Sequence, residues 1–167
     1  NPNDIQRFRE LDVIANFQPL WAYADEYVTD LNIPFVGEER GKWMYPIRSI
    51  VNAGGMIAFG SDWSVSTSNP FPQIETAVTR TDAEGNDEPF IPSETIDLQT
   101  ALAAFTINAA YLNGIEHVTG SLEVGKYADL IVVDRNVFEI SPKELSEVKV
   151  LLTLFGGKPV FGEVTSL

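Results

Sequence analysis

The sequence predicts an α/β fold in residues 1–117 and a smaller β region in residues 118–167. In the first part, short and continuously apolar segments alternate with segments of helical periodicity, which is typical of parallel strands covered on both faces. In the second part, several apolar segments follow one another with at most one short helix between them. The pattern changes between residues 116 and 120, and we place the domain boundary there.

The first part is expected to contain two buried strands among four helices. The first helix begins at Asn3 or Asp4, either of which can cap it, and ends near Leu11. The expected strands are residues 13–17 and 56–59, and the other expected helices are residues 46–52, 70–80 and 98–112. Two segments are expected to lack regular structure: the aromatic residues 20–45 and the polar surface residues 81–93.

The second part is expected to be mainly antiparallel. Predicted strands cover residues 120–126 (with a turn), 128–133 and 148–155, and a short helix is possible at residues 142–145. Gly156-Gly157 predicts a hairpin turn into a last strand at Val160-Phe161.

The composition excludes several classes of function. The chain has 24 acidic and 11 basic residues and a net charge of -13, so nucleic acids and anionic membrane surfaces are not expected partners. It has no cysteine, which excludes disulfides, thiolate nucleophiles and cysteine zinc sites. With 44% hydrophobic residues the chain can bury a sizeable core.

Asp62 is the candidate functional residue. It directly follows the predicted strand 56–59, in Gly60-Ser61-Asp62-Trp63. Active sites of parallel α/β folds gather where strands end, and a carboxylate there can bind a metal or act as a base. The alternative is a structural aspartate that caps a helix or closes a turn, and the spacing alone leaves both interpretations open.

Other candidates have simpler interpretations. His117 is the only histidine and lies in a connection, where we expect a surface role. An acidic cluster is expected to be a solvated loop; it comprises Asp82, Glu84, Asp87 and Glu88. The aromatic residues between positions 20 and 45 either line a substrate pocket or cover the fold.

Three stretches of the sequence resemble the amidohydrolase superfamily, in particular its amidohydrolase family 3 branch. The first contains Asp4-Ile5-Gln6-Arg7-Phe8 and Val13-Ile14-Ala15-Asn16-Phe17-Gln18-Pro19. The second runs from Gly60-Ser61-Asp62-Trp63 through Asn69-Pro70 to Ala77-Val78-Thr79-Arg80. The third joins Ala103-Ala104-Phe105-Thr106-Ile107-Asn108-Ala109-Ala110 to the segment from Gly120 to Asp134. Together they cover nearly the whole chain.

The resemblance implies a fold and a chemistry. In such proteins a (β/α)8 barrel carries one or two divalent metals, zinc among them, at its C-terminal face, and a small composite β-sandwich uses both chain ends. Residues 13–17 and 56–59 would then be barrel strands seven and eight, and residues 118–167 would belong to the sandwich. Asp62 would be both a metal ligand and the catalytic proton shuttle, in a hydrolase that cleaves a non-peptide, amide-like C–N bond of a small molecule.

The sequence departs from the family pattern in its metal ligands. It has no His-x-His pair, and no histidine precedes Asp62. Leu20-Trp21 follows Gln18-Pro19, where relatives often place a polar residue or histidine. A whole barrel takes about 250 residues, whereas this chain has 167. We therefore expect the C-terminal part of a longer enzyme, which alone binds no metal, is inactive and self-associates through its open edges.

Two other functions remain open from the sequence. One is a non-catalytic binding or structural module that retains the amidohydrolase fold. The other is a metal-dependent deaminase or lyase of the same superfamily.

Overall fold

A pair of short parallel strands forms the centre of the first part. The computed structural model describes residues 1–83 and 88–163. In it, β1 (Ala15–Phe17) pairs in parallel with β2 (Ile57–Phe59), and Ala15 lies opposite Ile57. The predicted parallel pairing is confirmed, although each strand is shorter than the apolar segment that predicts it.

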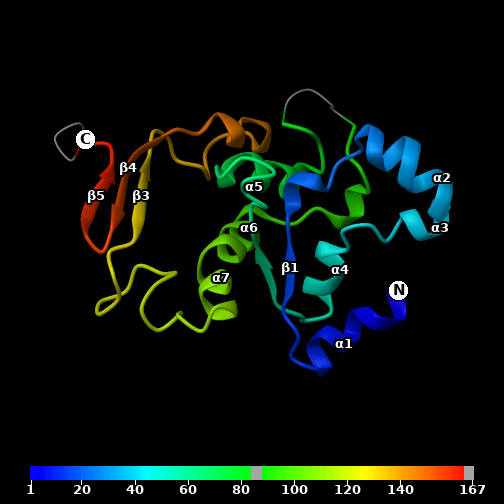
Figure 1. The fold of residues 1–167 in the computed structure, drawn as a ribbon, viewed down its shortest axis with the longest axis horizontal. Helices are drawn as coiled ribbons and strands as arrows, with labels where there is room; N and C mark the ends of the chain where they lie inside the picture. Colours follow the sequence, from blue (N-terminus) through cyan, green and yellow to red (C-terminus); the bar gives the residue numbers. More distant parts are fainter. Residues whose placement is uncertain (84–87, 164–167) are drawn as a thin grey trace.

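Helices flank this pair and pack in one buried cluster with Ile57 and Phe59. In Figure 1 the strands stand between α7 on one side and α4 on the other, and both helices contact β2. The helices and short helical turns of this part are η1 (Pro2–Asp4), α1 (Ile5–Glu10), α4 (Ile47–Asn52), α5 (Pro70–Thr79), η4 (Pro92–Glu94), α6 (Leu98–Phe105) and α7 (Ile107–Leu112). The predicted alternation of helices and strands is therefore observed.

The single helix predicted over residues 98–112 is wrong, because the chain breaks at Thr106. The backbone of Thr106 (φ -118°, ψ -97°) leaves the helical region and separates α6 from α7. Its hydroxyl donates to the Leu102 carbonyl at 2.7 Å, which is a local bond of the kind that competes with regular helix. Gly120 packs against the break, since a Cβ there would lie 3.0 Å from Ile107 Cα. The close approach of residue 120 is a tertiary contact that helical periodicity does not reveal.

Residues 20–45 are also more regular than predicted. They contain four short helical segments: η2 (Pro19–Trp21), η3 (Tyr27–Asn32), α2 (Ile33–Val36) and α3 (Glu38–Gly41). The first part of this region is organised by Asp25, whose carboxylate accepts from the Val28 N–H at 2.7 Å. This capping bond was not predicted, because the sequence around Asp25 is dominated by aromatic residues.

The second part forms a three-stranded antiparallel sheet. The strands are β3 (Leu130–Val133), β4 (Val150–Phe155) and β5 (Lys158–Phe161), in the order β3-β4-β5. The predicted hairpin between β4 and β5 and the short helix η5 (Pro142–Glu147) are confirmed. The strand predicted at residues 120–126 is wrong, because this segment turns at Gly120 and Gly125, which have φ of 87° and 100°.

One buried cluster joins the two parts of the chain. η5 packs on α5, and Leu145 and Val148 lie in the same apolar cluster as the strand residues Ile57 and Phe59. Along the part of the chain that the structure describes, no helix has the length and apolar character needed to cross a membrane.

Candidate active site

The two faces of the β1–β2 pair differ in character. Ile57 and Phe59 point into the apolar core, where the Phe59 ring meets the Phe105 ring edge to face at 5.3 Å between centroids. Side chains alternate along a strand, so Asn16 and Ala58, which lie opposite each other in the ladder, occupy the other face. This second face therefore carries the exposed, polar Asn16 and the small, fully buried Ala58.

The polar face continues past the ends of both strands. The Gly60 N–H donates to the Phe17 carbonyl at 3.0 Å, which extends the ladder by one residue. A Cβ at Gly60 would lie 3.9 Å from Asn16 Oδ1 and 4.0 Å from Gln18 Nε2. The two amide side chains thus converge over Gly60, at the carboxyl ends of the strands.

Asp62 lies two residues beyond Gly60 at the same end. Its φ of 57° is in the left-handed region, which aspartate tolerates better than most residues. Its backbone carbonyl accepts from the N–H groups of Val65 (2.8 Å) and Ser66 (3.3 Å), so residue 62 begins a tight turn. The side chain is exposed, and within residues 1–83 and 88–163 its carboxylate accepts no hydrogen bond. The next helix, α5, is capped by Asn69 instead. The backbone therefore forms a turn, but the carboxylate has no capping role within the described part.

A buried glutamine holds the turn in place. Gln73, fully buried on α5, directs its Nε2 to the carbonyls of Ser61 and Thr67, each at 3.4 Å. The Ser66 hydroxyl also donates to the Ser61 carbonyl. Sequence reasoning missed Gln73, although one signal was present: it is a polar residue among apolar neighbours in the first turns of a buried helix.

A second buried polar side chain, Arg80, fixes the aromatic segment behind the site. Its guanidinium donates to the carbonyls of Phe90 (2.8 Å), Tyr45 (3.1 Å) and Met44 (3.3 Å). Burial lowers the pKa of Arg80 to about 10, and the nearby Glu94 carboxylate opposes this shift, so the guanidinium is charged at neutral pH. Burial likewise raises the pKa of Tyr45.

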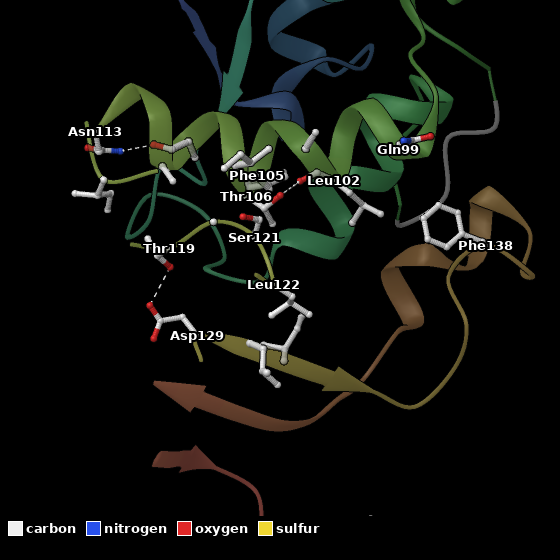
Figure 2. A pocket seen from close by; sticks show the side chains of 18 residues that line it. Gln99, Leu102, Phe105, Thr106, Asn113, Thr119, Ser121, Leu122, Asp129 and Phe138 are labelled. Carbon is white, nitrogen blue, oxygen red and sulfur yellow. Dashed lines mark hydrogen bonds between the residues drawn. The ribbon is translucent and has the colours of Figure 1, made fainter. Parts of the chain in front are cut away.

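Two cavities border α6. The smaller, of about 340 Å3, is lined by Gly60, Ser61 and residues of α5 and α6. The larger, of about 830 Å3, lies between α6–α7 and the segment from Thr119 to Ile131 (Figure 2). Its walls are mainly apolar, and its acidic group, Asp129, is engaged by the Thr119 hydroxyl at 2.9 Å and the Gly156 N–H at 2.7 Å. Of the two, the smaller cavity is the one that reaches Gly60 and Ser61, the residues directly before Asp62.

The remaining candidate residues do not join Asp62. His117 is exposed in the turn after α7, as expected. Asp82 and Glu88 flank a part of the acidic cluster, Glu84 and Asp87, that lies outside the described residues. Among the aromatic residues of the 20–45 segment, Phe35 is exposed whereas Tyr45 packs against the core, so the segment is divided between surface and core.

Comparison with known families identifies the family to which the chain belongs. Residues 1–161 match the model of the amidohydrolase family, in its family 3 branch. The chain belongs to the amidohydrolase family. The predicted family is therefore confirmed.

Individual relatives agree with this assignment. This amidohydrolase chain is 37% identical over 163 residues to Protein LONG AFTER FAR-RED 3 of Arabidopsis thaliana, covering 96% of the chain and 27% of the relative. It is 36% identical over 114 residues to N-substituted formamide deformylase of Arthrobacter pascens, covering 68% of the chain and 21% of the relative. The chain thus spans about a quarter of the length of these relatives.

Solved structures share the fold. A metal-dependent hydrolase from Pyrococcus horikoshii superposes with a TM-score of 0.72 at 24% identity, over 85% of this chain and 28% of the other. An amidohydrolase from Thermotoga maritima gives 0.64 at 20% identity, over 97% and 35%. The chain therefore has the α/β fold of metal-dependent hydrolases.

The described residues of this amidohydrolase chain do not by themselves fit a metal ion. No three His, Asp or Glu side chains within residues 1–83 and 88–163 lie close enough together to hold one. Zinc takes about four ligands, and Asp62 would supply one of them. The rest of such a site would have to come from other residues.

Proposed function

We propose that this chain forms the strand-seven and strand-eight side of a metal-dependent amidohydrolase that cleaves an amide-like C–N bond of a small molecule. The observation that carries the proposal is the position of Asp62, an exposed carboxylate at the carboxyl end of a parallel strand that accepts no hydrogen bond from residues 1–83 and 88–163. Relatives named as an N-substituted formamide deformylase and as 5-methylthioadenosine/S-adenosylhomocysteine deaminases support a reaction at a C–N bond, and the first of these names supports an amide-like one.

In this proposal β1 and β2 are neighbouring strands of a (β/α)8 barrel, and residues 118–167 belong to a composite β-sandwich. Parallel sheets are normally covered on both faces, and a pair of three-residue strands is too small to be stable alone. The three-stranded sheet likewise exposes large apolar side chains, among them Phe155 (70%), Val160 (63%) and Phe161 (58%). Both sheets therefore have room for further strands.

The exposed area supports the same proposal. A compact monomer of this mass exposes roughly 8,200 Å2, whereas this chain exposes 10199 Å2. The excess is comparable to the area that a stable protein interface buries. Without its complement, the chain is proposed to self-associate through these apolar faces and open strand edges.

Asp62 is proposed to handle the proton of the reaction. Its carboxylate accepts a proton from the attacking water and later gives it to the leaving amine, so one group serves as base and then as acid. The family is metal-dependent, and a neighbour of the same fold, an adenosine deaminase from Xanthomonas campestris, has bound zinc. A divalent metal, proposed to be zinc, would supply Lewis acidity when bound. The chain alone is proposed to be inactive.

A non-catalytic module with the amidohydrolase fold is the second candidate. It is favoured by the absence of a three-ligand cluster within the described residues. The name of the Arabidopsis relative also states no reaction.

Asp62→Asn, made in a full-length protein that contains this chain, tests the proposed function. Asn keeps the shape and the left-handed backbone but cannot transfer a proton, so kcat should fall about 10²- to 10⁴-fold. Metal content and melting temperature should stay near those of the wild type.

Asp12→Asn is the matched control. Asp12 is also an exposed aspartate with positive φ (52°), but it precedes β1 and so lies at the opposite end of the strands. Its substitution should leave kcat unchanged. Equal, measurable turnover in wild type and Asp62→Asn would refute the catalytic assignment of Asp62. Absence of turnover in the wild type would favour the non-catalytic module.

A further inference from the structure

The polar face of the β1–β2 pair presents two side-chain amides near a single point, and each amide has a hydrogen-bond donor and an acceptor. Asn16 Oδ1 and Gln18 Nε2 lie 3.9 Å and 4.0 Å from the position that a Cβ on Gly60 would occupy. The side chains come from positions i and i+2 of one chain segment, so the pleat of β1 directs both to the same face. The absence of a side chain at Gly60 leaves the space between them open.

Both amides are available to a ligand. Within residues 1–83 and 88–163, neither the Asn16 nor the Gln18 side chain has a hydrogen-bond partner. Asn16 is exposed and Gln18 is half-buried. This contrasts with Asn108, whose side chain donates to the Ile57 carbonyl at 2.9 Å and so has a structural role. Polar side chains on a sheet face that is covered on its other side, and that are not used internally, are suited to binding.

The arrangement selects a chemical class. Two amides, each with a donor and an acceptor, complement a group that has both an N–H and a C=O, such as an uncharged secondary amide. A carboxylate would be disfavoured, because it brings no N–H and because the Asp62 carboxylate lies two residues beyond Gly60.

We propose that Asn16 and Gln18 are specificity-determining residues that bind the scissile amide of the substrate, Gln18 donating to its C=O and Asn16 accepting from its N–H. This inference rests on the proposed function and names the residues that recognise its substrate. It assigns the polar face of β1, beside Gly60, as the subsite that orients the amide next to Asp62.

The experiment compares two probes in a full-length protein that contains this chain. N-butylformamide has an N–H, whereas butyl formate has the same carbonyl and chain without one. Gln18→Ala should raise KM for both probes roughly 3- to 10-fold, the effect of one neutral hydrogen bond. Asn16→Ala should raise KM by a similar factor for the formamide and leave it unchanged for the ester.

Two controls keep the outcomes distinct. Gln6→Ala, at an exposed position on α1, should leave both KM values unchanged. Metal content should be the same in all variants. KM values that are unchanged in Gln18→Ala and Asn16→Ala, or an Asn16→Ala effect equal for amide and ester, would overturn the inference.

Failure of the inference can be separated from failure of the proposed function. If Asp62→Asn retains full turnover, the proposed function fails whatever the KM values show. If the wild type hydrolyses neither probe, calorimetric titration with N-butylformamide decides the matter. Binding that Gln18→Ala weakens would then support the subsite, and the absence of binding by the wild type would overturn it.

Discussion

The two ends of the β1–β2 pair carry similar residues in opposite surroundings. Each end has an exposed aspartate in the left-handed conformation, Asp12 (φ 52°) and Asp62 (φ 57°). Each also has a glycine beside β2. At Gly55 a Cβ would lie 2.8 Å from Ile50 Cγ2 and 3.2 Å from the Ile50 carbonyl oxygen, whereas at Gly60 it would meet nothing closer than 3.9 Å.

The comparison teaches that residue type and backbone conformation do not identify a site. The amino end is closed by tertiary packing, and the Arg9 side chain donates to the Gly54 carbonyl there at 3.3 Å. The carboxyl end is open at Gly60, and the side chains of Asn16, Gln18 and Asp62 there have no hydrogen-bond partner among residues 1–83 and 88–163. The position in the topology, and the free space that goes with it, separates a structural glycine and aspartate from candidates for binding and catalysis.

After the loss of turnover expected for Asp62→Asn, the largest contrast is between the two glycines. Gly55→Ala should lower the free energy of unfolding by about 1–3 kcal/mol, because its methyl group must displace Ile50. Gly60→Ala should change stability by less than about 0.5 kcal/mol, as is usual away from tight packing. Urea unfolding of both variants measures the difference.

The same pair should show the reverse order in substrate binding. Gly60→Ala places a methyl group between the amides of Asn16 and Gln18, so KM should rise in the full-length protein. Gly55→Ala should leave KM unchanged at temperatures where it is folded. A stability loss in Gly60→Ala as large as that in Gly55→Ala would show that the carboxyl end is packed as tightly as the amino end. It would contradict the difference between the two ends.

Gln73 offers a smaller contrast between stability and function. Gln73→Leu removes two long hydrogen bonds of 3.4 Å but also removes Oε1, which is buried without a partner among the described residues. These effects offset each other, so stability should change by less than about 1 kcal/mol. The turn from residue 61 to 67 loses its anchor, and kcat should fall a few-fold.

Thr76→Val is the control on the same helix. Thr76 is equally buried, but its hydroxyl donates only to the Pro72 carbonyl of α5, at 3.1 Å. Its kcat should match the wild type. Equal kcat in Gln73→Leu and the wild type would show that Gln73 does not position the turn.

The smallest expected effect concerns the caps of two helices, Asn69 at α5 and Asp97 at α6. The Thr100 N–H bond to the Asp97 carboxylate holds the pKa of Asp97 below its usual value. A lowered folded-state pKa stabilises the fold above the unfolded pKa of about 3.9, and this contribution is lost as pH falls through the folded value. Asp97→Asn should therefore cost about 0.3–1 kcal/mol near neutral pH and nothing in stronger acid.

Asn69→Ala provides the comparison without a titrating group. Its loss should be about 1 kcal/mol at every pH, because the Asn69 amide is uncharged. Unfolding curves at several pH values distinguish the two. A cost of Asp97→Asn that persists below the folded pKa would contradict the charged-cap interpretation.

Patterns that depend on local sequence were the ones that predicted structure correctly. The apolar segments located β1, β2, β3 and the β4–β5 hairpin, and Gly54-Gly55 correctly ended α4. The break at Thr106 was missed because it depends on Gly120, fourteen positions later. At residues 120–126 the turn was predicted, but the strand was wrong because the apolar residues Leu122 and Val124 face solvent. Contacts between distant segments are not encoded in periodicity.

The site was predictable to the same extent. The strand-end argument located Asp62, because it needs only the end of an apolar segment. Asn16 was not predicted as a site residue, because a single polar residue within the apolar segment Val13–Phe17 does not change the prediction of a buried strand. Its alternation with Gln18 was the signal, and it becomes meaningful only once the opposite face is known to pack against helices.

The hydrogen bonds between Arg80 and Phe90 have a practical consequence for engineering. Besides the guanidinium bond to the Phe90 carbonyl, the Phe90 N–H donates to the Arg80 carbonyl at 2.8 Å, so both ends of the excursion between them are tied together. The length of the chain between Arg80 and Phe90 should therefore have little effect on the stability of the fold. Each doubling of such a loop costs only about 0.6 kcal/mol in closure entropy. An affinity tag or fluorescent reporter inserted between Arg80 and Phe90 should leave the scaffold intact.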